Sequence, residues 1–275
     1  MKVLLTGAAG VVGTALLASV PHGVQLTATA RSTPVRSGDQ PTGGDVIGPV
    51  ELTDPVQVDR LVERTGADLV VHAAASMRSR SDVVEATHCV AGAAASAGAA
   101  LVHLSTDTVF DGEHPPYSES STPAPVNDYG HWKLDAELAA RGAVHDATIT
   151  RTSLVVSLHP PDRTSAAFLD AMRAGAPPTM FDDELRSPIR ADDLAARLWA
   201  LVALDRAQRG GVWHLPGPEV LSRHGLAVRL CRAAGLDAGG VPRASVRDHP
   251  SPRPRDLTLV SSRPTLVDAP PRPVP

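Results

Sequence analysis

The stretch TGAAGVVG, residues 6–13, lies between the apolar run KVLL and the helical pattern VVGTALLAS. Its glycines, Gly7, Gly10 and Gly13, have a GxxGxxG spacing. In such a turn the backbone bends tightly, comes close to a pyrophosphate and directs the amides of the next helix at its charge. The spacing also arises by accident in chains rich in alanine and glycine. Its position directly after the first strand favours a dinucleotide-binding fold.

Outward from this turn, short apolar runs alternate with helical patterns over the first 156 residues. The alternation and the short connections predict an α/β fold, a Rossmann-type, doubly wound parallel sheet covered by helices on both faces. The expected strands cover residues 2–7, 24–31, 67–75, 100–107 and 147–156, and the expected helices cover 11–19, 54–66 and 88–99 and start again near 129.

The pattern loosens beyond residue 156 into helices, a short strand GVWHL and loops. We predict a dinucleotide-binding domain over 1–156, a smaller and mainly substrate-binding region over 157–260 with interleaved boundaries, and a proline-rich tail over 261–275. Eight of the last 28 residues are proline, which predicts a segment that is either extended over the surface or disordered.

Bulk properties favour a small solute as the partner. The chain has 275 residues, 43% of them hydrophobic, and a net charge of -4 with no run of one sign, which argues against nucleic acid or a membrane. Cys89 and Cys231 are isolated, so we expect no disulfide, no metal site and a cytoplasmic protein. The first 20 residues resemble a secretory signal, but their glycines and their fit as a strand and helix argue against one.

The end of the second strand bears on the choice of cofactor. An acidic residue there would hold the ribose hydroxyls of NAD, whereas this chain has Arg31, which could pair a 2′-phosphate. NADP(H) is therefore favoured and NAD(H) stays open. The alternative is that Arg31 is a solvated surface charge.

A candidate catalytic pair stands in NDYGHWKLDAE, residues 127–137. The chain has two tyrosines and two lysines, and one of each stands four residues apart, as Tyr129 and Lys133. On a helix these side chains share one face, and a nearby positive charge would lower the pKa of the tyrosine toward a useful range for proton transfer. Ser105 or Thr106, at the end of a strand, could hydrogen-bond a carbonyl oxygen, although such residues are more often turn formers.

Several motifs together resemble the dTDP-4-dehydrorhamnose reductase branch of the extended short-chain dehydrogenase/reductases. They are TGAAGVVG, HAAA, STDTVFDG, PYSES, DYGHWK, RTSLV, SPIRADDLA and LPGPEVLSRHGLA, and they run to about residue 260. The resemblance implies a nicotinamide cofactor across the sheet and a nucleotide sugar held by the C-terminal region. Thr106 would polarise the substrate carbonyl, Tyr129 would donate a proton, and Lys133 would bind the nicotinamide ribose and lower the tyrosine pKa.

Two sets of contact residues are expected, from the positions of the residues and from the resemblance together. The cofactor set is Gly7, Gly10, Val11, Val12, Gly13, Arg31, Glu51, Leu52, Ala73, Ala74, Ala75, Tyr129 and Lys133. The substrate set is Ser105, Thr106, Asp107, Val109, Phe110 and Leu154.

The chain departs from the family pattern near the expected site. After HAAA it has the shorter, basic loop SMRSRSDVVEATHCVAG, and Leu154 stands where these reductases usually have a tryptophan. Leucine removes a flat surface for packing against a sugar or base. Cys89 stands where an asparagine is common in the superfamily. The substrate pocket is therefore expected to differ.

Other polar residues have two interpretations each. Asp107 and Asp111 could touch substrate or shape their loop, and Arg253 and Arg255 could clamp a diphosphate or form a solvated basic turn. Asp192 and Asp193 are expected to cap a helix.

The sequence thus predicts an NADP-preferring reductase of a 4-keto nucleotide sugar or a related small carbonyl substrate. Two alternatives stay open: an epimerase or dehydratase of the same superfamily, and a non-catalytic NADP-binding regulatory subunit. For the assembly, a homodimer stays open.

Overall fold

The protein is described here by a computed structural model that covers residues 1–31 and 45–275. Within these residues the main feature is a parallel sheet of seven strands in the order β3-β2-β1-β4-β5-β6-β11. Its strands are β1 (Lys2–Thr6), β2 (Gln25–Thr29), β3 (Asp45–Ile47), β4 (Leu69–His72), β5 (Ala100–Thr106), β6 (Thr148–Thr152) and β11 (Gly211–Leu215). The predicted α/β class and parallel sheet are confirmed.

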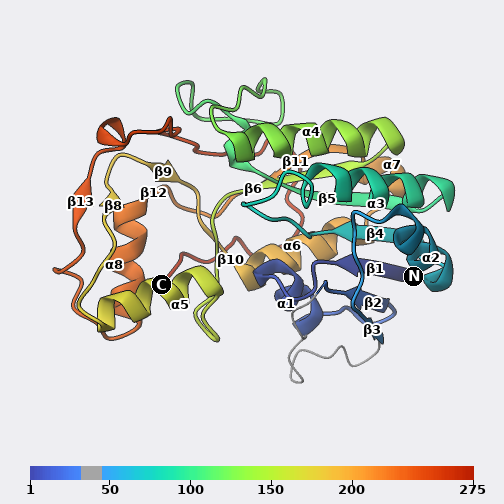
Figure 1. Ribbon diagram of the computed structural model, residues 1–275, viewed down its shortest axis with the longest axis horizontal. Coiled ribbons are helices and arrows are strands. Elements are labelled where there is room, and N and C mark those ends of the chain that lie inside the picture. Colours follow the sequence, from blue (N-terminus) through green and yellow to red (C-terminus); the bar gives the residue numbers. More distant parts are fainter. Residues whose placement is uncertain (32–44) are drawn as a thin grey trace.

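Helices cover both faces of the sheet (Figure 1). Successive side chains of β1 point to opposite faces: Leu5 joins a core with α1 and α6, and Leu4 joins a second core with α2, α3 and α4. Because both faces are buried, the central strands β1 and β4 contain continuous apolar runs. The helices are α1 (Val11–Ala18), α2 (Pro55–Thr65), α3 (Val84–Ser96), α4 (Asp128–Ala143), α6 (Ala191–Ala203) and the short α7 (Arg206–Arg209).

Local sequence explains where the helices begin and end. Asp54 caps α2 by accepting hydrogen bonds from the amides of Val56 and Gln57 at 3.0 and 3.2 Å, Pro55 follows it, and Gly66 ends the helix with a φ of 54°. Asn127 caps α4 through the amide of Gly130 at 2.9 Å. The short helix α1 has Gly10 as its N-cap, without a capping side chain.

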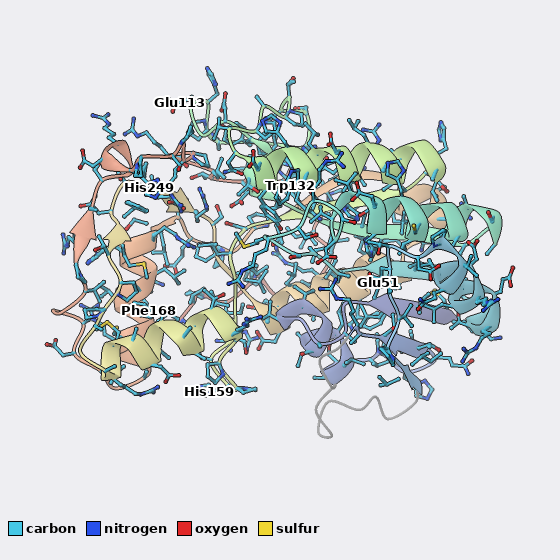
Figure 2. All side chains as sticks on the ribbon, viewed as in Figure 1. Glu51, Glu113, Trp132, His159, Phe168 and His249 are labelled. Carbon is cyan, nitrogen blue, oxygen red and sulfur yellow. The ribbon has the colours of Figure 1, made fainter. Side chains whose placement is uncertain are left out.

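The C-terminal region forms a separate cluster around α5 (Arg163–Arg173) and α8 (Arg223–Ala233), with Phe168 of α5 in its apolar core (Figure 2). Three two-strand sheets accompany these helices. They pair β7 (Val155–Val156) with β10 (Ile189–Arg190), β9 (Leu185–Arg186) with β12 (Leu221–Ser222), and β8 (Met180–Phe181) with β13 (Arg243–Ala244). The chain returns to the large sheet through α6 and β11.

Two sequence expectations need adjustment. The expected strand 147–156 is divided, because β6 ends at Thr152 and the next strand, β7, pairs with β10 instead of continuing in the large sheet. The proline-rich end has the short 3₁₀ helix η3 (Val246–Asp248) and then extended chain, which packs through Leu257, Leu259 and Val274. None of the helices in the described residues has the length and apolar character needed to cross a membrane.

Candidate active site

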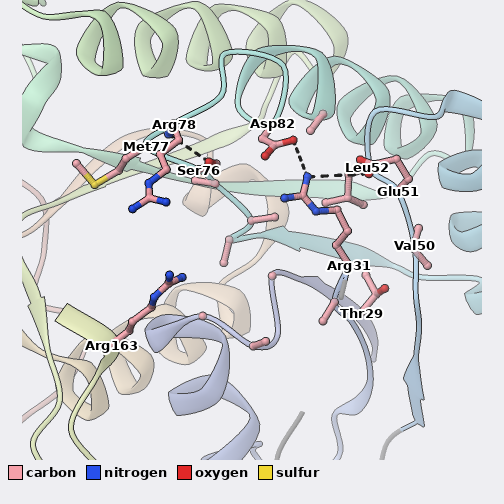
Figure 3. A pocket seen from close by; sticks show the side chains of 18 of the residues that line it. Thr29, Arg31, Val50, Glu51, Leu52, Ser76, Met77, Arg78, Asp82 and Arg163 are labelled. Carbon is pink, nitrogen blue, oxygen red and sulfur yellow. Dashed lines mark hydrogen bonds and ion pairs between the residues drawn. The ribbon is translucent and has the colours of Figure 1, made fainter. Parts of the chain in front are cut away.

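A cleft of about 790 Å³ opens at the carboxyl ends of the strands, where ligands bind in open α/β sheets. Its walls come from the turns that follow β1, β2 and β4, the segment after β3, and the start of α5 (Figure 3). Most of the residues expected to bind the cofactor line it: Gly7, Gly10, Arg31, Glu51, Leu52, Ala73, Ala74 and Ala75.

The glycine turn fits a closely approaching ligand. Gly7 has a φ of +81°, and a Cβ there would lie 2.6 Å from the Ala74 amide nitrogen, so this position requires glycine. The Gly10 amide donates to the Gly7 carbonyl at 3.0 Å, and α1 starts directly after it. The turn therefore leaves room for a pyrophosphate beside the first amides of α1.

Gly13 and the side chains of Val11 and Val12 have packing or surface positions of their own. A Cβ at Gly13 would lie 2.2 Å from the Gly7 carbonyl oxygen, so this glycine lets α1 pack against the turn. The side chain of Val12 is buried in the core, and Val11 lines a second cleft of about 830 Å³ that continues past α1. The Val12 side chain therefore does not face the cleft, and a contact of the cofactor with the backbone amides of Val11, Val12 or Gly13 stays a prediction.

The candidate catalytic residues come from neighbouring elements. Thr106 ends β5 and caps the 3₁₀ helix η2 (Asp107–Val109), whereas Tyr129 and Lys133 lie in the first turns of α4. Lys133 Nζ donates to the Leu104 carbonyl at 2.7 Å and approaches His103 Nε2 at 3.3 Å, which fixes this side of α4 to β5.

Gly130 lets α4 approach η2 closely. A Cβ at this position would lie 2.2 Å from the Thr108 carbonyl oxygen and 2.8 Å from Pro125 Cβ. The helix that carries Tyr129 can therefore sit directly against the turn that carries Thr106.

The pKa values of Tyr129 and Lys133 differ from what the sequence led us to expect. Burial, with a smaller contribution from the Asp107 carboxylate, raises the pKa of Tyr129 to about 12, where we expected lysine to lower it. Burial also lowers the pKa of Lys133 to about 8, against the opposing charge of Glu137. Tyr129 is therefore a neutral phenol near neutral pH, and Lys133, which donates to β5, is not among the causes of its pKa shift.

Thr106 is half-buried and its hydroxyl has several partners. It accepts from the Thr108 amide at 3.3 Å, lies 3.1 Å from Thr108 Oγ1, and can donate to Asp107 Oδ1 at 3.3 Å. These contacts are long, so the hydroxyl proton can turn to a better acceptor.

Most of the residues expected to bind substrate are buried or make contacts within the protein. Val109 and Phe110 are fully buried in a core with Tyr117, so we correct the expectation that they contact substrate. Buried Ser105 donates to Glu137 Oε1 at 2.5 Å, and Leu154 packs against the C-terminal core.

Asp107 links the two parts of the molecule. It is 2% exposed, accepts from Ser153 Oγ at 2.6 Å and lies 3.7 Å from Arg186 Nε. Burial raises the pKa of its carboxyl group, and Arg186 and Ser153 oppose that change. Asp107 therefore holds the turn after Thr106 against the C-terminal region and has little surface for a ligand.

The remaining polar candidates have structural partners, except Arg255, whose buried Nε has no hydrogen-bond partner among the described residues. Asp111 accepts from the Tyr117 hydroxyl and the Glu113 amide, and Arg253 pairs with Glu184 at 2.8 Å. Asp192 and Asp193 lie in the first turn of α6, whose N-cap is Arg190, and both pair with Arg272, so the prediction that they cap the helix is wrong.

Three charged residues of the cleft were missed from the sequence. Asp82 accepts from Arg31 Nη1 at 2.7 Å, and Arg78 and Arg163 approach the cleft from opposite walls (Figure 3). The side chains of Arg78 and Arg163 have no ion-pair partner among the described residues. The basic character of the 76–83 loop was the one available signal. Among the described residues, no group of three histidine, cysteine or acidic side chains could hold a metal ion.

Comparison with known proteins gives one family. Residues 1–267 match the model of the RmlD substrate binding domain. The chain is 33% identical over 233 residues to dTDP-4-dehydrorhamnose reductase of Mycobacterium tuberculosis, covering 78% of this chain and 74% of that protein. It is 28% identical to the probable low-salt glycan biosynthesis reductase Agl14 of Haloferax volcanii (98% and 95% covered), and 27% identical to methionine adenosyltransferase 2 subunit beta of Xenopus laevis (78% and 69%).

Solved structures agree with this family. A hypothetical dTDP-4-dehydrorhamnose reductase from Sulfolobus tokodaii has a TM-score of 0.78 at 28% identity, over 94% of this chain and 92% of that one. Two more distant structures share the fold. They are the reductase of Bacillus anthracis in complex with NADP (TM-score 0.76, 22% identity, 93% and 88% covered) and WbmH of Bordetella bronchiseptica in complex with NAD+ (0.78, 19%, 95% and 89%).

Proposed function

The chain belongs to the RmlD family, the dTDP-4-dehydrorhamnose reductase-like branch of the extended short-chain dehydrogenase/reductases, and from this membership we propose that it reduces the 4-keto group of a nucleotide sugar with NADPH. It is an NAD(P)-dependent oxidoreductase, as its reductase relatives indicate. The observation that carries the proposal is a combination of two features. One is a cleft with a glycine turn in its wall. The other is the end of β5, the strand next to β4, with the start of α4, which bear Thr106, Tyr129 and Lys133, although none of these three lines the cleft itself.

The proposed roles follow from the chemistry of each group. A bound nicotinamide supplies the hydride. Thr106 would donate a hydrogen bond to the ketone oxygen, and Tyr129, protonated at neutral pH because its pKa is about 12, would give its proton to the alkoxide that forms. Lys133, held by the Leu104 carbonyl, would keep a positive charge behind the phenol.

The cofactor preference is proposed from Arg31, which lies at the end of β2 and lines the cleft. A guanidinium at this place can pair a 2′-phosphate. NADH is expected to bind more weakly.

A titration with NADPH and NADH, followed by a panel of 4-keto nucleotide sugars, tests the proposal. Saturable NADPH binding with loss of absorbance on one sugar is the expected result. No binding of either cofactor would contradict the assignment of the cleft.

A second function is favoured by one observation, the similarity to methionine adenosyltransferase 2 subunit beta. A regulatory subunit would bind the dinucleotide without consuming it. Binding of NADPH with no turnover on any sugar of the panel would support this alternative.

A further inference from the structure

Arg31 is already neutralised by acidic neighbours. Its Nη1 lies 2.7 Å from Asp82 Oδ1 and 4.0 Å from Glu51 Oε2, and all three residues line the cleft (Figure 3). Asp82 comes from the loop before α3, 51 positions further along the chain. The charge that would attract a 2′-phosphate is therefore shared with two carboxylates.

Asp82 is the closer of the two carboxylates to Arg31 and the less exposed. Its side chain is 21% exposed, compared with 41% for Glu51, and its backbone amide donates to Ser79 Oγ at 3.1 Å. A 2′-phosphate carries close to two negative charges and needs the same guanidinium donors. It would have to share the guanidinium with Asp82, which accepts from Nη1, and would lie near a carboxylate of like sign.

We propose that Asp82 sets the cofactor selectivity of this site by competing with the 2′-phosphate of NADP for Arg31. NADH has no group that needs the guanidinium in this way, so it would bind with the Arg31–Asp82 pair intact. The inference rests on the proposed function only in that a nicotinamide dinucleotide occupies this cleft. It predicts a modest preference for NADPH in the natural protein, smaller than an unpaired arginine would give.

The test is the affinity of the purified protein for NADPH and NADH, followed by nicotinamide fluorescence without any substrate. Asp82→Asn is nearly isosteric and removes the competing charge, so we expect NADPH to bind about tenfold more tightly and NADH within about twofold of the natural protein. Asp146→Asn is the matched control. It removes the same charge from another arginine pair, with Arg206, at the opposite edge of the sheet, and should change neither affinity.

A double-mutant cycle tests whether Asp82 acts through Arg31. In an Arg31→Met background, Asp82→Asn should leave NADPH affinity almost unchanged. An equal gain in that background would overturn the proposal, since Asp82 would then act by direct repulsion of the phosphate. Unchanged NADPH affinity in the single Asp82→Asn variant would overturn it as well while leaving the proposed function standing, whereas absence of any cofactor binding to the natural protein would overturn both.

Discussion

The imidazole rings of His72 and His103 lie 5.3 Å apart in the middle of the sheet, because the two residues are register partners on β4 and β5. Both are fully buried. Burial, together with the charge of Lys133, lowers the pKa of His72 to about 3. Burial, with Lys133 and His72, holds the pKa of His103 well below 6.5. Both rings are therefore neutral in the folded protein near neutral pH.

This pair predicts sensitivity to mild acid. Between pH 6.5 and the lowered pKa values, the unfolded chain binds protons that the folded protein does not, so the free energy of unfolding falls as the pH falls. The expected loss approaches about 1.4 kcal/mol per pH unit for each histidine. Urea unfolding at pH 7, 6 and 5 measures it.

A control separates buried from exposed histidines. His22 is exposed and its side chain has no hydrogen-bond or ion-pair partner among the described residues, so His22→Gln is the control for the loss of a histidine that the fold does not bury. A free energy of unfolding that is the same at pH 5 and pH 7 would show that the two rings do not remain neutral.

Lys133 is expected to cost stability while serving the site. Its pKa falls from 10.5 to about 8, which corresponds to about 3 kcal/mol of unfavourable burial at pH 7. Lys133→Met should therefore raise the free energy of unfolding at pH 7 by about 1–3 kcal/mol, since the lost hydrogen bonds offset part of the gain. The unfolded chain keeps its lysine proton up to about pH 10.5, so the difference should shrink as the pH rises from 8 toward 10.5. A variant less stable at pH 7 would contradict this account.

The sheet was predictable because its evidence is local. The strands β1 and β4 are short apolar runs, and the N-cap Asp54 and the following Pro55 stand in the sequence where α2 begins. The short strand β3 (Asp45–Ile47) was not expected. Gly7 and Gly10 could be placed in the cleft because a GxxGxxG turn between strand and helix has few other uses. The division of the expected strand at 147–156 was not visible, because β7 finds its partner β10 more than 30 residues later.

The site was predictable where spacing alone decides the geometry, as for Tyr129 and Lys133 on one helical face. The role of a residue was less predictable where its side chain could point either toward the cleft or into the core. Ser105 and Phe110 lie in the same motif as Thr106, yet one donates to Glu137 and the other enters a core. The pair of Arg31 with Asp82 joins residues 51 positions apart, which no local pattern indicates.

Tyr129→Phe should separate binding from chemistry. The change removes only the hydroxyl, so cofactor affinity should stay within about twofold, while turnover should fall by about 10²–10⁴ if Tyr129 is the general acid. Because the pKa of Tyr129 is about 12, loss of its proton should not limit the natural protein at or below pH 9. Stopped-flow hydride transfer over pH 6–9 checks both statements, and full turnover of the variant would remove Tyr129 from the mechanism.

Arg163 is expected to bind the pyrophosphate, which NADPH and NADH have in common. It lines the cleft from the start of α5, away from Arg31 (Figure 3), and has no ion-pair partner among the described residues. Arg163→Ala should weaken NADPH and NADH by similar factors of about 5–20, as the loss of one charged hydrogen bond to a pyrophosphate would. Arg173→Ala, on the same helix and paired with Asp170, is the matched control. A loss confined to NADPH would place Arg163 at the 2′-phosphate instead.

Gly130 has no reactive group, and yet the meeting of α4 with the turn after β5 depends on its missing side chain. An alanine there would push Tyr129 away from Thr106 and leave all three reactive side chains present in the sequence. Sorting members of this family into enzymes and inactive paralogues by an inventory of those three residues would then misplace such a chain. The residue that follows the tyrosine should therefore be checked together with the three reactive residues.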